Sequence, residues 1–143
     1  MTTYWHMQMH RDNVHAAEAK DIWSILEHKN IIGLGDWEDG QEQIRVFKED
    51  MDVNDIVAIK NGANLIALVQ IIGGAYEVRN DGWINYRRPI RILDWAIDGE
   101  TIEQPRGTLN ICKDQNAATT KTIKGWHDRV CTIMKKRKIP LTV

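Results

Sequence analysis

The most constraining feature of this sequence is an Asn61-Gly62 dipeptide between two strongly apolar runs. The runs cover 56–60 and 65–72, and both are rich in isoleucine, valine, leucine and alanine. Asn-Gly favours the tight turn whose central residues both have positive φ, so two such runs form an antiparallel hairpin. Short, hairpin-like connections of this kind favour a curled, largely antiparallel sheet over a doubly wound parallel one.

Further strands and helices are predicted on both sides of this hairpin from the spacing of apolar residues. The predicted strands cover 2–10, 30–34, 56–60, 65–72, 75–78 and 84–95. The predicted helices cover 14–28, 42–50 and 120–137. The segment 97–107 is loop-like, and 108–118 has no pattern that decides between a strand and a helix.

The two longer predicted helices each carry an apolar stripe at three- or four-residue spacing. In the first helix the stripe consists of Ala19, Ile22, Trp23 and Leu26. In the last helix it consists of Ile123, Trp126, Val130, Ile133 and Met134. We therefore predict an α+β fold: one domain over 1–143, with a curved, mixed, mostly antiparallel sheet or partial barrel flanked by two main helices.

The number of tryptophans and the net charge limit the functions that this chain can have. The chain has six tryptophans but one phenylalanine, and its net charge is −1, which counts against coating nucleic acid by bulk electrostatics. Trp37 and Trp83 lie in turn-rich polar surroundings, where an indole can bind a guest or fold back as a lid over the core. The four tryptophans in apolar periodic segments are expected in the core: Trp5, Trp23, Trp95 and Trp126.

A series of short motifs between residues 3 and 95 resembles a known family. The motifs are Tyr4-Trp5 with Gln8, Trp23, the Ile-Ile-Gly-Leu-Gly-Asp-Trp stretch at 31–37, Phe47 and Met51, Asn54-Asp55-Ile56-Val57, 67–74 with Tyr76, Trp83, 87–90 and 93–95. Their order resembles EVE-like and YTH-like members of the PUA superfold, most of all the N-terminal specificity domains of McrB-type modification-dependent restriction systems. Many relatives have Gly-Asp where this chain has Asn54-Asp55, and asparagine also accepts a left-handed turn conformation.

The resemblance implies a module that holds one modified, typically methylated, base in an aromatic cage and does not cleave. The base-binding residues it implies are Trp37, Trp83, Asp36, Tyr76, His6 and Gln8. The candidate phosphate-binding residues are Arg87, Arg88, Lys60 and Arg11, for which simple solvation is the alternative. The implied partners are DNA or RNA with a modified base, and a fused or separate AAA+ motor and nuclease. No cofactor is expected.

Two other function classes remain open. A small hydrolase of the ASCH kind, acting on a modified nucleoside, needs a lysine or carboxylate with a displaced pKa, and Lys60 near Asp36 is a candidate pair. A protein-interaction module needs an exposed anchor, for which Trp37 is the candidate. The basic run at 135–138 suits a helix C-terminus or a secondary phosphate contact.

Several kinds of site lack support in the sequence. The pairs His6/His10 and His127/Cys131 have no third metal ligand at a suitable spacing, and no phosphate-cradling glycine loop occurs. The two cysteines do not suggest a disulfide framework. Without an apolar run of about 20 residues or a signal segment, we expect a cytoplasmic protein that does not enter a membrane.

Overall fold

The computed structural model describes the chain apart from residues 1, 10–18, 80–83, 98–99 and 103–107. Its centre is a sheet with the strand order β2-β6-β4-β3-β1-β7, and β5 also pairs with β6. The strands are β1 (Tyr4–Gln8), β2 (Ile31–Leu34), β3 (Ile56–Asn61), β4 (Asn64–Ile71), β5 (Tyr76–Glu77), β6 (Tyr86–Trp95) and β7 (Leu109–Ile111). The α-helices are α1 (Ala19–Ser24), α2 (Gln41–Glu49) and α3 (Ala118–Lys136). The π-helical turn η2 (Ile25–Lys29) continues α1, and the 3₁₀ turn η3 (Glu38–Gly40) precedes α2.

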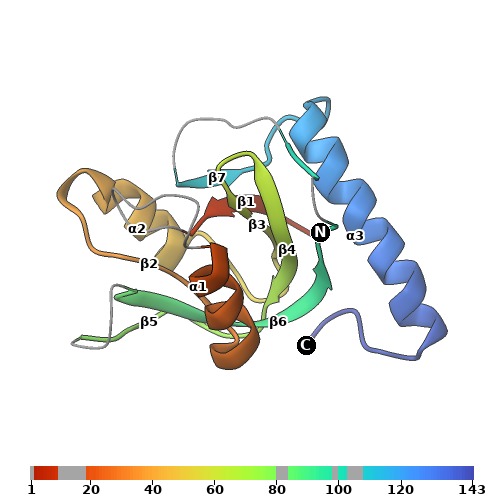
Figure 1. The fold of residues 1–143 in the computed structure, drawn as a ribbon, viewed down its shortest axis with the longest axis horizontal. Helices are drawn as coiled ribbons and strands as arrows, with labels where there is room; N and C mark the ends of the chain where they lie inside the picture. Colours follow the sequence, from red (N-terminus) through yellow and green to blue (C-terminus); the bar gives the residue numbers. More distant parts are fainter. Residues whose placement is uncertain (1, 10–18, 80–83, 98–99, 103–107) are drawn as a thin grey trace.

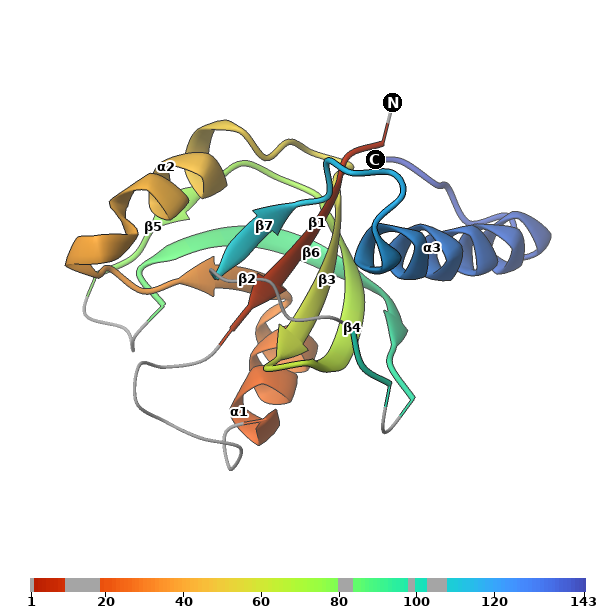
Figure 2. The ribbon, with the colours of Figure 1, turned by 90° about the horizontal axis from the view of Figure 1, so that it is seen from above.

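The predicted fold class is confirmed. β3 and β4 form the predicted antiparallel hairpin, but the turn is shifted by one residue: Asn61 pairs with Asn64, and Gly62 and Ala63 lie between them. Gly62 has a positive φ of 61°, whereas Asn61 does not have a positive φ. β1 pairs in parallel with β3, while the other pairings of the described strands are antiparallel. The sheet curls strongly, with α1 and α2 on one side and α3 on the other (Figures 1 and 2). Asn54 has a left-handed φ of 76°, a conformation that asparagine accepts.

The two faces of the sheet carry separate apolar clusters. Side chains alternate along β1 and β3, so Trp5, Met7, Val57 and Ile59 face one way, toward α1, η2 and α2. Their neighbours Ile56 and Ala58 face the other way, toward α3. One cluster of apolar residues therefore lies under α1 and α2, and the second lies under α3.

Two residues predicted in the helix stripes are exposed. Trp23 is 43% exposed beside the buried Ile22, and Ile133 is 52% exposed beside the buried Met134. Adjacent residues of a helix point about 100° apart, so a residue next to a stripe position lies at its margin. Sequence spacing does not decide which of two adjacent apolar residues the sheet covers. Trp5 and Trp126 are buried as predicted, and Trp95 is half-buried.

The end of α3 turns sharply at Lys138, whose φ of 56° is left-handed. The Ile139 amide donates to the Met134 carbonyl at 2.9 Å, which closes the helix end in the way glycine-terminated helices usually do. The chain then returns to the sheet, where Gln70 Nε2 donates to the Leu141 carbonyl at 2.7 Å. No helix among the described residues is long and apolar enough to cross a membrane.

Replacing Lys138 with glycine is expected to raise the free energy of unfolding by about 1 kcal/mol, because glycine adopts the left-handed conformation without the cost a side chain carries. Urea unfolding of Lys138→Gly against the wild type measures it. Lys124→Gly, in an exposed and ordinary helical position, is the control and should lose about 1 kcal/mol. Equal losses in both variants would contradict the role of the Lys138 conformation.

Candidate functional site

Trp37 lies in the loop that leaves β2, and its position depends on Gly40. A Cβ atom placed on Gly40 would lie 1.8 Å from the indole Cε2, so the ring rests directly against the glycine. The Gly40 amide also donates to the Trp37 carbonyl at 3.1 Å. Trp37 is half-buried and packs against the apolar cluster under α2. The loop thus holds the indole in one place and leaves part of it open to solvent.

Asp36, beside this indole, is held by partners from three other elements. Its backbone amide donates to Asn85 Oδ1 at 3.1 Å, and its carboxylate accepts from Gln41 Nε2 at 3.1 Å. Arg79 lies 3.8 Å from the second carboxylate oxygen and also pairs with Glu77 of β5. An exposed hydrogen-bond acceptor, held by these contacts, therefore lies in the same loop as the partly open aromatic ring.

The same end of the sheet contains β5. Tyr76 is 44% exposed on this strand and pairs with Arg87 of β6. The Arg79 bridge between Glu77 and Asp36 connects β5 to the loop that carries Trp37. Trp83, the second predicted cage wall, lies outside the described residues. Asp36, Trp37 and Tyr76 thus lie at one end of the sheet, but Tyr76 is paired with Arg87 and faces away from the neighbouring Tyr86, which belongs to the same apolar cluster as Trp37. The predicted indole sandwich stays a prediction.

His6 and Gln8 do not join this group. They alternate along β1 with Trp5 and Met7, which belong to the same apolar cluster as Trp37, so they face away from it. Gln8 is buried and accepts a hydrogen bond from the Gly62 amide at 2.9 Å. The predicted pocket floor is therefore not formed by these two side chains, because the strand puts them on the opposite face of the sheet.

Lys60 is buried instead of lying at a solvent-exposed hairpin. It is 1% exposed, and its Nζ lies 2.9 Å from His6 Nδ1. Burial lowers the pKa of Lys60, and burial together with the Lys60 charge lowers the pKa of His6 to about 4. The side chain in contact with the Lys60 ammonium is thus His6, whereas Asp36 contacts Gln41 and Arg79. The predicted phosphate contact and the predicted Lys60–Asp36 pair therefore find no support in this arrangement.

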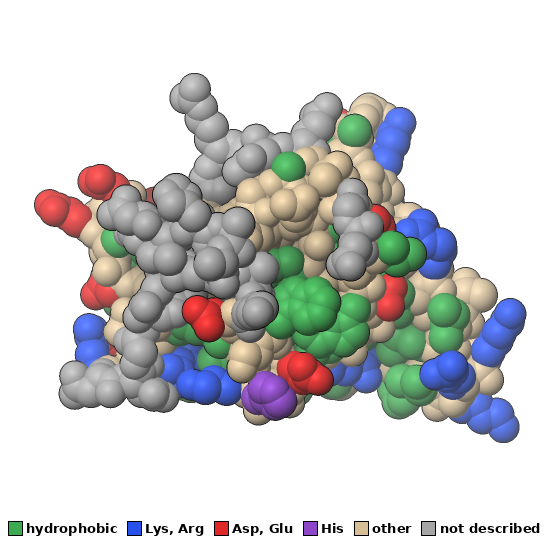
Figure 3. Space-filling model, viewed as in Figure 1, with side chains coloured by type: hydrophobic (Ala, Val, Ile, Leu, Met, Phe, Trp, Pro, Cys, Tyr) green, Lys and Arg blue, Asp and Glu red, His purple; other side chains and the backbone are tan. Residues whose placement is uncertain are grey.

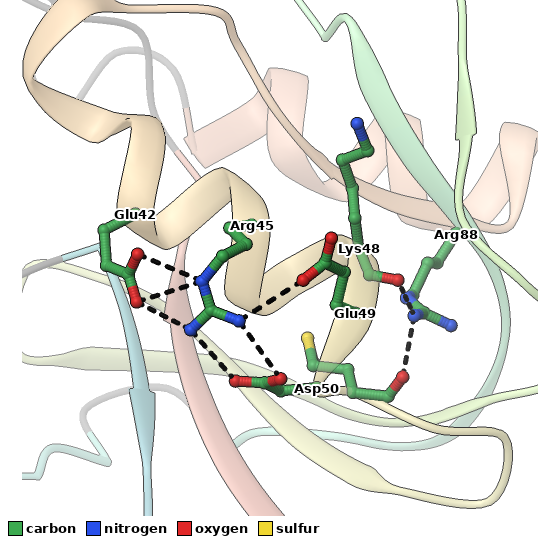
Figure 4. Close-up of polar contacts among 7 residues, drawn as sticks. Glu42, Arg45, Lys48, Glu49, Asp50 and Arg88 are labelled. Carbon is green, nitrogen blue, oxygen red and sulfur yellow. Dashed lines mark hydrogen bonds and ion pairs between the residues drawn. The ribbon is translucent and has the colours of Figure 1, made fainter.

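Arg88 is also an internal residue (Figure 4). It is 4% exposed and donates to the carbonyls of Phe47 at 2.8 Å, Met51 at 2.7 Å, Lys48 at 3.1 Å and Gly73 at 3.1 Å. These bonds tie the end of α2 and the segment after β4 to β6. The guanidinium is directed at backbone acceptors, so its predicted phosphate role is replaced by a structural one.

The two remaining phosphate candidates differ in what can be said of them. Arg87 is 8% exposed, and its Nε donates to the Ile84 carbonyl at 2.9 Å. Arg11 lies outside the described residues. The sequence places Arg87 near a turn and contains no signal that this arginine is buried in the strand.

The surface around Trp37 is acidic. Exposed carboxylates near it in the chain are those of Asp36, Glu38, Asp39 and Glu42. Figure 3 shows acidic side chains at the end of the molecule that carries α2, and basic side chains along α3 at the opposite end. Phosphate groups are therefore repelled near Trp37 and attracted near α3.

Two features of the surface were not predicted. Asn85 joins the Trp37 loop to β5, because it accepts from Asp36 and its amide and carbonyl bond Leu34 and Val78. Trp23 and Trp95 form an aromatic pair, with ring centroids 5.3 Å apart and planes tilted by 34°. Neither feature belongs to a sequence motif, because each depends on how separate elements meet.

The His127–Cys131 pair predicted from its spacing is in contact. Cys131 Sγ lies 3.3 Å from His127 Nε2, and Tyr4 OH lies 2.8 Å from His127 Nδ1. Burial is the main cause that raises the pKa of Tyr4 to about 12 and lowers that of His127. Within the described parts of the chain, no three His, Cys, Asp or Glu side chains gather in a way that could hold a metal ion.

No protein-family model matches this chain, and no curated protein matches it.

Proposed function

We propose that this chain is a nucleic-acid-binding domain that recognises a modified base by stacking it on Trp37. The supporting observation is the indole held against Gly40 and half-open to solvent, with the Asp36 carboxylate held by Gln41 in the same loop. The predicted second wall, Trp83, completes the proposed cage. The family resemblance extends the proposal to the targeting part of a restriction or defence system that acts on methylated DNA.

Energetics decide what such a site can do. Taking a base out of a duplex costs a few kcal/mol, and stacking on one aromatic ring returns about 1–3 kcal/mol. Asp36 can accept a hydrogen bond from an exocyclic amine, and a methyl group adds about 0.8 kcal/mol of burial. A single indole with one edge contact thus suits a base that is already unpaired, while a duplex requires a second wall.

A hydrolase acting on a modified nucleoside is the second candidate, and Lys60 favours it. Burial lowers the pKa of this lysine, which raises the fraction of neutral amine available as a nucleophile or base. At 1% exposure, however, Lys60 is closed to solvent and faces away from Trp37. A substrate could reach Lys60 only if the surrounding structure opened. The base-binding proposal needs no such opening, because Trp37 and Asp36 already lie at the surface.

Trp37→Ala is expected to remove one stacking contact, which corresponds to a loss of about 5- to 150-fold in affinity for the modified oligonucleotide. The preference for modified over unmodified oligonucleotides should disappear with it. The measurement is fluorescence anisotropy at fixed salt with matched methylated and plain DNA and RNA, single- and double-stranded. Gly40→Ala should reproduce the loss, because the added methyl group displaces the indole.

The matched control is Trp23→Ala, which removes an exposed indole from α1 and should leave the preference intact. An unchanged preference in Trp37→Ala, with a wild-type melting temperature, would eliminate the proposed cage. Turnover of modified nucleosides by the purified chain, lost in Lys60→Met, would establish the hydrolase instead. A protein-interaction module would show neither effect.

A further inference from the structure

The charges of this chain are divided sharply along the sequence. Residues 113–143 carry eight Lys or Arg and two Asp or Glu, a net charge of +6. The preceding 112 residues carry eleven and eighteen, a net charge of −7, and the two parts together give the −1 of the whole chain. A net charge near zero thus conceals a strongly basic C-terminal part, most of which is α3.

Within α3 the basic residues lie on the face opposite the core. The buried residues of the helix are Thr119, Thr120, Ile123, Trp126, Val130 and Met134. The exposed basic residues are Lys121, Lys124, Arg129, Lys135 and Lys136, which we call the α3 cationic face. At about 100° per residue these five side chains occupy an arc of roughly 140° centred opposite the buried stripe. Asp128 is the acidic residue within that arc.

Stability does not account for this face. The ion pairs found among the described residues involve Arg45 and Arg79, and none involves a basic residue of α3. Cations near the C-terminus of a helix interact favourably with its dipole, which explains Lys135 and Lys136. Lys121 is the fourth residue of α3, where the dipole disfavours a cation, and the first turn contains no acidic residue. Lys121 thus breaks a local rule without an evident structural gain, which is typical of functional positions. Lys124, one turn further on, donates one exposed hydrogen bond to Gln115 at 3.3 Å.

The helix holds these cations in fixed positions. On its inner side Trp126 Nε1 donates to Asp94 Oδ2 at 2.7 Å, and His127 contacts Tyr4 of β1. After the helix, Arg91 Nη2 donates to the Pro140 carbonyl at 2.6 Å. A helix of 19 residues is about 28 Å long, so the basic side chains project from an extended row of fixed backbone positions.

We infer that the α3 cationic face binds the phosphate backbone of a nucleic acid, independently of the sequence or modification of its bases. A membrane surface fits less well, because amphipathic helices bind membranes through their apolar face, and that face of α3 is buried against the sheet. This face lies at the opposite end of the molecule from the acidic surface around Trp37 (Figures 1 and 3). The inference therefore stands whether or not Trp37 binds a base.

The test is binding of the full chain to an unmodified 20-base-pair DNA duplex across a salt series. Each phosphate contact contributes about −0.9 to the slope of log K against log salt concentration. Lys121→Gln/Lys124→Gln is expected to reduce the slope by about 1.8 and to weaken binding roughly 60-fold at 0.1 M salt. This pair should change the stability of the helix little, because both side chains are exposed. Lys121→Gln removes a charge that the dipole disfavours, and Lys124→Gln removes an exposed hydrogen bond to Gln115.

Two further variants make the result specific. Lys29→Gln/Lys48→Gln removes the same charge from exposed positions of the acidic part and should leave the slope unchanged. Asp128→Asn should tighten binding several-fold, a gain that no loss of folding can produce. Trp37→Ala should bind the unmodified duplex like the wild type, which separates this face from the proposed base site.

Several results would overturn the inference: no binding of the wild type to the duplex at 50 mM salt, or an equal loss in the control pair. Binding to phosphatidylserine vesicles without binding to DNA would assign the face to membranes instead.

Discussion

Replacing Arg88 with methionine is expected to lower the free energy of unfolding by about 3–5 kcal/mol. The guanidinium satisfies four backbone carbonyls in a buried position, and methionine fills its volume without donating to any of them. Each carbonyl left buried without a partner costs about 1–3 kcal/mol, less where the end of α2 can relax toward water. Urea unfolding followed by circular dichroism measures the loss.

Arg45 is the matched control, since it also makes several polar contacts but at the surface (Figure 4). It pairs with Glu42, Glu49 and Asp50 on and after α2, and all these side chains are exposed. Water and salt replace such pairs with little change in free energy, so Arg45→Met should leave stability nearly unchanged. Comparable losses in the two variants would contradict the structural role of Arg88.

His6→Asn is expected to make the protein markedly more resistant to acid. The pKa of His6 is lowered from 6.5 to about 4 by burial and by the charge of Lys60. Between these values the unfolded chain binds more protons than the folded one, so stability falls as the pH is lowered from about 6.5 toward 4. A shift of this size corresponds to about 3 kcal/mol, which the asparagine variant would not lose. Its amide oxygen can still accept from Lys60.

Denaturant unfolding of both proteins at a series of pH values from 8 to 4 measures this difference. The two curves should run parallel above pH 7 and diverge below pH 6.5. Curves that stay parallel down to pH 4 would show that His6 is not the titrating group. Lys60→Met should reduce the divergence, because it removes the second cause of the shift.

Most of the fold could be predicted because the elements are local. The hairpin around Asn61-Gly62 and the amphipathic α3 follow from turn chemistry and apolar spacing within one segment. β7 could not be predicted, because its three residues form a strand only by pairing with β1 about a hundred residues earlier. Trp23 was wrongly predicted as buried, since its periodicity fits the stripe while the sheet covers its neighbour Ile22.

Less of the site could be predicted, because basic side chains carry no sequence signal for burial. Arg88 and Lys60 were expected to meet phosphates, yet their partners are carbonyls and a histidine from other elements. The alternation of β1 is visible in the sequence, but which face would meet Trp37 is not. Asp36 and Trp37 are brought to the surface together because both lie in one short loop.

The parallel pairing of β1 with β3 has a consequence for how the chain acquires its shape. Tyr4 lies opposite Ile56, so β1 cannot pair with β3 until some fifty more residues have been synthesised. During that interval its apolar face, with Trp5, Met7 and Met9, is exposed and can contact other incompletely folded chains. The hairpin of β3 and β4, closed by local contacts, is the natural template on which the N-terminal strand is captured.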